Sequence, residues 1–315
     1  MPNCRVLLST LPGRSLDAIQ RRQWPEMTLQ PLTVPERKEL LAKFLQQFSK
    51  KLTASQTERI VSAEQTANPL YLGTLLDELR QFGSYELFEQ RLTWYLETTD
   101  LRELFERVLT RWEEDFGGET DLVGDSLSLI WASRFGLSEA ELLCVLGPDD
   151  QPLPRAKWTP IFLATGYNLV IRGGLLNFGH QYLRDAVHEA YFPTETHERQ
   201  VRLRLASYFD RGAELTDRKL DEEPWLLHEA AAWEQQKKLL AGIPIFVKLR
   251  SKERWKWELH RYWVALSSRY DPCDAYCEAL IHWESGVSSH NDLPVTLNEL
   301  ATSITNEPNR APRSR

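Results

Sequence analysis

The amino-acid sequence predicts a mainly α-helical protein with one isolated β-strand and one β-hairpin. Signals for the start of a helix recur along most of its 315 residues, as at Thr33 and Asn68. Two short apolar runs flank Gly173-Gly174, a pattern typical of a hairpin because glycine adopts positive φ without a steric clash. A third apolar run stands at the N-terminus, apart from any other strand signal. Several small packing units therefore follow one another along the chain.

The N-terminal apolar run, residues 5–13, is predicted to be a short buried strand that ends at a Pro-Gly turn. Strands of a parallel sheet are covered on both faces and lose the alternation of apolar and polar residues. A single strand cannot form a sheet, so we expect its neighbours to lie upstream of Met1 or on another molecule. Residues 1–30 are thus interpreted as the last strand and edge of a larger core.

Residues 31–117 are predicted to form a small helical bundle. Thr33 and Glu36 have the spacing of a capping box at the start of the first helix. Asn68 before Pro69 is the pattern of an N-cap followed by a first-turn proline, and apolar residues then recur on one helical face.

The rest of the chain is predicted to contain a winged helix and a helical array. In residues 118–193, helical segments lead into a hairpin over residues 169–178, and His180 then opens another helix. Residues 194–305 are predicted to form successive helical hairpins rich in tryptophan. The tail, residues 306–315, is rich in proline and arginine and is predicted to be disordered.

The composition is that of an ordinary soluble protein, with 42% hydrophobic and 26% charged residues. A net charge of −7 without a basic stripe argues against nucleic-acid binding.

There is no signal peptide or membrane-spanning run, and the four cysteines show no paired spacing, so we expect a cytoplasmic protein without a membrane partner. Cys273 and Cys277 lack the tight turn spacing of structural zinc ligands, and no metal site is predicted. The acidic run Asp221-Glu222-Glu223 is interpreted as a solvated loop.

The order of several segments resembles one known family. These segments are RVLLSTLPG, RRQWPEMTLQPLTVPER, TANPLYLGTLLDELRQFGSYE, GLSEAELLCVLG, GGLLNFGHQYLRDAVHEAYFP and EEPWLLHEAAAWEQQKKLL. Together they resemble NACHT-type signal-transduction ATPases of the STAND class, in the branch of nephrocystin and telomerase-associated protein. The resemblance covers nearly the whole chain. It implies that residues 1–30 end a NACHT core, 31–117 form its helical lid, 118–193 its winged helix and 194–305 its helical superstructure, which leads toward repeats of the tetratricopeptide type.

The resemblance also implies a nucleotide-binding role for four residues. In such proteins the last core strand ends in a polar residue that faces the nucleotide phosphates, a role that falls here on Ser9 or Thr10. Pro69 would pack near the base, and His180 would approach the phosphates in the closed, ADP-bound state. The start of a helix favours an anion on its own account, because free N–H groups and the helix dipole point toward it.

We do not expect the chain to be an enzyme by itself, and no catalytic residue is predicted. None of its 15 glycines is followed by lysine, so it has no G-x-x-x-x-G-K-[ST] loop, and no acidic residue ends an apolar strand. The resemblance therefore implies the C-terminal regulatory part of a NACHT ATPase. This part would close over ATP or ADP with Mg²⁺, and an upstream core would hold that nucleotide. It would relay the state of the nucleotide to protein partners, and the nucleotide would also drive self-association. No cofactor is expected for the chain alone.

Two alternatives remain open. The helical hairpins would serve equally well as a protein-protein interaction scaffold without any nucleotide role, since helical solenoids readily supply such surfaces. A DNA-binding winged helix is the weaker alternative, because residues 155–166 carry only Arg155 and Lys157 as cations.

Overall fold

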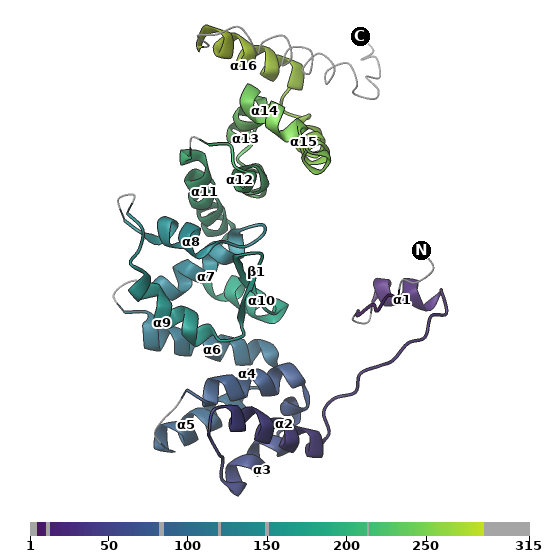
Figure 1. The fold of residues 1–315 in the computed structure, drawn as a ribbon, viewed down its shortest axis with the longest axis vertical. Coiled ribbons are helices and arrows are strands. Elements are labelled where there is room, and N and C mark those ends of the chain that lie inside the picture. The colour runs from purple at the N-terminus through teal and green to yellow at the C-terminus, as the bar shows by residue number, and fades with distance from the viewer. Residues whose placement is uncertain are drawn as a thin grey trace. The chain divides into compact units, whose positions relative to one another are not determined.

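The computed structural model describes residues 5–10, 13–81, 85–118, 121–148, 151–212 and 214–286. In these residues the regular secondary structure is helical apart from one two-stranded sheet and an isolated β-bridge (Figure 1). The mainly helical class with a single hairpin is therefore confirmed. The chain divides into two compact units, residues 1–83 and residues 84–315.

The predicted N-terminal strand is wrong for residues 5–10, which have no regular secondary structure. Val6, Leu7 and Leu8 are 69%, 97% and 51% exposed. The helix that follows, α1 (Arg14–Gln20), buries none of its residues. An apolar run becomes a strand only when a neighbouring strand pairs with its backbone, and none does so in the described part of the chain. The end of the predicted strand, Leu11 and Pro12, lies outside the described residues.

The first unit contains the first helices of the expected bundle: α2 (Val34–Gln47), α3 (Ala54–Ser62), the 3-10 turn η1 (Glu64–Ala67) and α4 (Pro69–Leu79). The other helices expected in that bundle, within residues 85–116, belong to the second unit. The predicted capping box opens α2, where the Thr33 N–H donates to Glu36 Oε2 over 2.7 Å. Asn68 Oδ1 accepts the Leu70 N–H over 2.9 Å at the start of α4. Arg37 ties the helices together, because its Nη1 donates to the Val61 carbonyl over 2.8 Å.

The second unit begins with helices that surround the hairpin. Its elements up to residue 191 are α5 (Tyr85–Leu96), α6 (Leu101–Phe116), α7 (Leu122–Ala132), α8 (Glu139–Leu146), α9 (Arg155–Thr165), β1 (Leu169–Arg172), β2 (Leu175–Phe178) and α10 (Gln181–Tyr191). The strands are antiparallel, and the predicted turn residues Gly173 and Gly174 both have positive φ. The predicted domain boundary at residue 117 stays a prediction. In the structure, α6 packs on α7, α9 and α10, which lie beyond that boundary.

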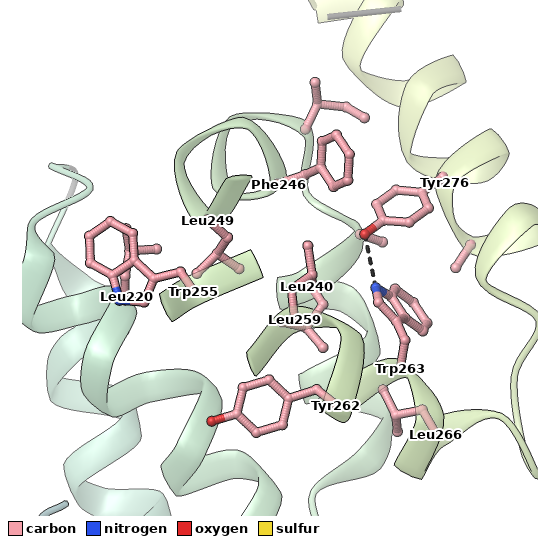
Figure 2. Close-up of a cluster of buried hydrophobic side chains, with 13 residues drawn as sticks. Leu220, Leu240, Phe246, Leu249, Trp255, Leu259, Tyr262, Trp263, Leu266 and Tyr276 are labelled. Carbon is pink, nitrogen blue, oxygen red and sulfur yellow. Dashed lines mark hydrogen bonds between the residues drawn. The ribbon is translucent and has the colours of Figure 1, made fainter. Parts of the chain in front are cut away.

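The helical array occupies the rest of the second unit. We use this name for α11 (Glu195–Arg211), α12 (Asp217–Glu229), α13 (Trp233–Ala241), α14 (Ile243–Arg250), α15 (Glu253–Leu266) and α16 (Pro272–Gly286). Figure 2 shows the apolar core that α12 to α16 share, in which the Trp263 indole N–H donates to the Tyr276 hydroxyl over 2.9 Å. The predicted helical hairpins are present as far as residue 286. The predicted disordered tail lies outside the described residues.

The acidic run Asp221-Glu222-Glu223 is not a loop but the middle of α12, and Glu222 and Glu223 are buried. The prediction was wrong because it considered only composition. Two cations precede the acids by four residues each, Arg218 before Glu222 and Lys219 before Glu223, and both pairs form ion pairs in the structure. This spacing of four residues is typical of a helix, and the sequence already contained it.

Candidate interaction site in the helical array

The four residues with a predicted nucleotide role lie in different parts of the structure. Ser9 and Thr10 are exposed in the irregular N-terminal segment. Pro69 is the exposed first residue of α4, in the first unit. His180 is the half-buried N-cap residue of α10, in the second unit, and its side chain makes no capping hydrogen bond. Partial burial lowers the pKa of His180 below its usual value. The nucleotide role of these residues stays a prediction.

One face of α12 is joined to the hairpin region by a buried carboxylate. Glu222 accepts the Arg134 N–H over 2.8 Å and the Phe135 N–H over 3.0 Å, directly after the end of α7. Arg218 Nη1 also donates to Glu222, over 3.0 Å. Burial raises the pKa of Glu222, and these hydrogen bonds and the Arg218 charge act in the opposite direction. Each Glu222 oxygen thus has at least one donor, and the carboxylate acts as a structural link.

Further ion pairs extend this link to α8 and α15. The Arg134 guanidinium binds both carboxylate oxygens of Glu258 on α15, over 2.8 and 2.7 Å. Arg218 Nε donates to Glu141 on α8 over 3.0 Å. Paired hydrogen bonds between guanidinium and carboxylate fix geometry as well as charge. We call Glu141, Arg134, Arg218, Glu222 and Glu258 the junction cluster; it holds the array in a defined position on the hairpin region.

The other side of α12 faces an open pocket of about 470 Å³. We call it the groove pocket. Its walls come from α11, α12, α13 and the start of α14, and they are lined by Leu203, Ala206, Ser207, Asp210, Glu223, Leu227, Gln235, Lys238, Leu239, Gly242 and Ile245. Five of these residues are aliphatic, so an apolar group can pack between the helices. The packing of α11 on α12 and of α12 on α13 keeps the pocket formed without a ligand.

Glu223 is the unusual member of the groove pocket. It is only 3% exposed, and it forms an ion pair with Lys219, whose Nζ lies 3.6 Å from Glu223 Oε2. The same Nζ atom also donates to the main-chain carbonyls of Asp210 and Gly212, over 3.1 and 3.3 Å, so Lys219 is shared among several acceptors. Burial therefore raises the pKa of Glu223 to about 7, and Lys219 only partly opposes the shift. Sequence reasoning missed this residue.

Among the described residues, no group of three or more His, Cys, Asp or Glu side chains is placed to hold a metal ion. In the same residues, no helix combines the length and the apolar character that a membrane crossing needs. Cys273 and Cys277 both lie on α16.

Comparison with known proteins finds relatives, some of which are named for tetratricopeptide repeats. A TPR repeat-containing protein of Dictyostelium discoideum is 29% identical over 272 residues, which are 86% of this chain and 16% of that protein. Tetratricopeptide repeat protein 41 of Rattus norvegicus is 28% identical over 70% of this chain and 20% of its own length. Human nephrocystin-3 is 25% identical over 77% of this chain and 19% of its own length. The chain thus spans a fifth or less of each relative.

No family model matches the sequence, and no solved structure gives a significant match. The sequence is similar to tetratricopeptide repeat proteins and, more weakly, to nephrocystin-3. The similarity to tetratricopeptide repeat proteins supports the predicted helical, repeat-like character, while the assignment to NACHT ATPases and to their nephrocystin branch stays a prediction.

Proposed function

We propose that the helical array is a protein-protein interaction scaffold and that it holds a partner in the groove pocket. The groove pocket carries this proposal: closely packed helices leave an open space with aliphatic walls and one buried carboxylate. Stacked helical hairpins characteristically present such surfaces to other proteins. The similarity to proteins named for tetratricopeptide repeats supports the same conclusion. Of the functions that the sequence leaves open, the scaffold is therefore preferred to the nucleotide-dependent regulator.

The junction cluster supports this proposal from the other side of α12. Its hydrogen bonds fix the helix that forms the floor of the pocket, so the pocket is present before a partner arrives. A preformed site loses less conformational freedom on binding, and more of the contact energy then appears as affinity.

Filling the mouth of the pocket tests the function. Ser207 is exposed on α11 at the pocket, whereas Ala265 is exposed on α15 and does not line it. Proteins captured on the immobilised full chain are identified, purified and titrated by calorimetry against wild type, Ser207→Trp and Ala265→Trp. We expect Ser207→Trp to weaken the binding of the true partner at least tenfold. Ala265→Trp, the same small-to-tryptophan change elsewhere on the array, is expected to leave it within twofold. If the captured partners bind wild type, Ser207→Trp and Ala265→Trp with equal affinity, the proposed role of the pocket is contradicted.

A nucleotide-linked role is the second candidate, supported by one observation. His180 stands at the N-terminus of α10 with a side chain that does not cap its own helix. A helix N-terminus favours an anion such as a phosphate. Because the chain has no phosphate-binding loop, the nucleotide must be held by a separate ATPase core. If the chain has this nucleotide-linked role, His180→Ala is expected to weaken the binding of ADP when the ATPase core is present.

A further inference from the structure

The outer side of α15 faces away from the apolar core of the array. The inner side packs into that core through five residues, Trp255, Leu259, Tyr262, Trp263 and Leu266 (Figure 2). Four exposed residues follow one another along the outer side at intervals of three and four positions. We call them the outer stripe: Arg254, Trp257, Arg261 and Val264. Residues at this spacing are neighbours on one face of a helix, so cationic and apolar side chains alternate along this face.

Two apolar residues of the outer stripe stand in solvent. Trp257 is 69% exposed, and Val264, two helical turns further on, is 57% exposed. A single exposed apolar residue is common on protein surfaces and needs no explanation. A tryptophan and a valine on the same face of one helix instead form an apolar seam, and tryptophan is enriched among the residues that contribute most to protein binding. The outer stripe is therefore a candidate surface for a partner.

The charge of this part of the array is positive, although the whole chain has a net charge of −7. Residues 233–266 contain eight Lys and Arg residues and only three Asp and Glu residues. The two acids on α15 already have cationic partners, because Glu253 pairs with Lys256 and Glu258 pairs with Arg134. An acid that approaches this surface thus meets an excess of cations, and a base is repelled.

Arg261 is the cation of the outer stripe that remains available to a partner. Arg254 already donates from Nη2 to both carboxylate oxygens of Asp221, over 2.6 and 2.7 Å. Within the described residues, Arg261 forms no hydrogen bond or ion pair. It lies between Trp257 and Val264 along the helix, so an acid bound to it is flanked by two apolar contacts.

We infer that the outer stripe binds an amphipathic α-helix of a second protein partner, with apolar side chains on Trp257 and Val264 and an acidic side chain at Arg261. Alternation of three and four positions is the spacing at which two helices pack along a shared seam. The excess of cations selects an acidic helix over a basic one, because opposite charges attract across an interface and like charges repel. The inference rests on the proposed scaffold function and adds a surface separate from the groove pocket, which no residue of α15 lines.

The experiment titrates the full chain by calorimetry with three helical peptides of about 21 residues, a length at which isolated helices can form. The first peptide carries leucine at alternating intervals of three and four residues, with glutamate at the neighbouring positions. The second has lysine in place of every glutamate, and the third has alanine in place of every leucine. We expect the first peptide to bind at least about tenfold more tightly than either of the others, because only it supplies both the acidic and the apolar contacts.

Variants at two exposed positions of the outer stripe, where misfolding is not expected, locate the binding. Trp257→Ala should weaken the binding of the acidic peptide about tenfold, whereas Trp24→Ala, at an exposed tryptophan of the first unit, should leave it within about twofold. Arg261→Glu should also weaken it about tenfold, and this variant should bind the lysine peptide more tightly than wild type does. Arg199→Glu, the same charge reversal at an exposed position of α11, is the matched control and should leave the affinity within about twofold.

Three results would overturn the inference: equal affinity for the acidic and lysine peptides, no binding of the acidic peptide, or equal losses in Arg261→Glu and Arg199→Glu. If the acidic peptide does not bind, vesicles of anionic phospholipid that bind wild type and not Trp257→Ala would identify a membrane-binding surface instead. The groove pocket is tested with its own captured partner and Ser207→Trp, so the scaffold function and this inference can fail separately.

Discussion

Glu222 and Glu223 are adjacent residues of α12, both buried, and they differ in almost everything else. Glu222 faces the hairpin region and receives hydrogen bonds from two main-chain N–H groups and from Arg218. Glu223 lines the groove pocket, where its ion-pair partner Lys219 also donates to two main-chain carbonyl groups.

The difference separates a fully compensated charge from a partly compensated one. A buried carboxylate that is fully hydrogen-bonded specifies how elements pack, and removing it leaves several other groups unpaired. A buried carboxylate whose only nearby cation is shared with other acceptors is desolvated without full compensation, and its ionised form weakens the folded state. The two sides of one helix thus serve different purposes, a fixed junction and an open site.

The largest effect is expected where the junction carboxylate is removed. Glu222→Ala leaves Arg218 and the Arg134 and Phe135 N–H groups without their acceptor. We expect the free energy of unfolding to fall by about 3 to 5 kcal/mol at pH 7, measured by urea denaturation of the full chain. As a control, Glu253→Ala removes an exposed partner of Lys256 and should change stability by less than about 0.5 kcal/mol. A loss below about 1 kcal/mol for Glu222→Ala would remove the contrast between the two carboxylates.

The second effect should have the opposite sign. The pKa of Glu223 rises from 4.5 to about 7 on folding, so the folded chain keeps a proton that the unfolded chain has lost between these values. Stability therefore falls as the pH rises from 4.5 to 7. Glu223→Gln carries no charge and avoids this fall. It should be more stable than wild type by up to about 3 kcal/mol at pH 8, with little difference near pH 4.5. If the free energies of unfolding of wild type and Glu223→Gln change in parallel from pH 4.5 to 8, Glu223 is not desolvated.

The smallest effect concerns the outer part of the junction cluster. Arg134 and Glu258 form a two-bond ion pair whose side chains are each 19% exposed. A double-mutant cycle with Arg134→Ala and Glu258→Ala should give a coupling free energy of about 1 kcal/mol. The exposed pair Lys43 and Glu39 provides the comparison and should give less than about 0.5 kcal/mol. Equal coupling in the two pairs would mean that partial burial does not strengthen the junction.

The sequence predicted the helix starts and the hairpin well because their signals are local. The capping residues Thr33 and Asn68 each act within three residues of themselves, and each opens a helix in the structure. Gly173-Gly174 likewise forms the turn of the hairpin. By contrast, the N-terminal apolar run was predicted as a strand, and a strand depends on a partner that sequence alone does not reveal.

The candidate site depended mostly on tertiary contacts. The spacing of Lys219 and Glu223 was visible in the sequence, and it indicated only a pair on the surface of a helix. How Lys219 is shared between Glu223 and the carbonyls of Asp210 and Gly212 depends on the loop before α12 and on the end of α11. The groove pocket is lined by residues of four successive helices, from Leu203 to Ile245, and it depends on how these helices pack, so no local pattern predicts it.

The sequence by itself determined that this chain is a succession of capped helices around one hairpin, because caps, turns and helical faces are decided by neighbours along the chain. Only the tertiary structure decided which of two adjacent acids becomes a structural link and which lines an open pocket. The reason is physical: the energy of a buried charge depends on the donors that surround it in space, and those donors come from distant parts of the sequence.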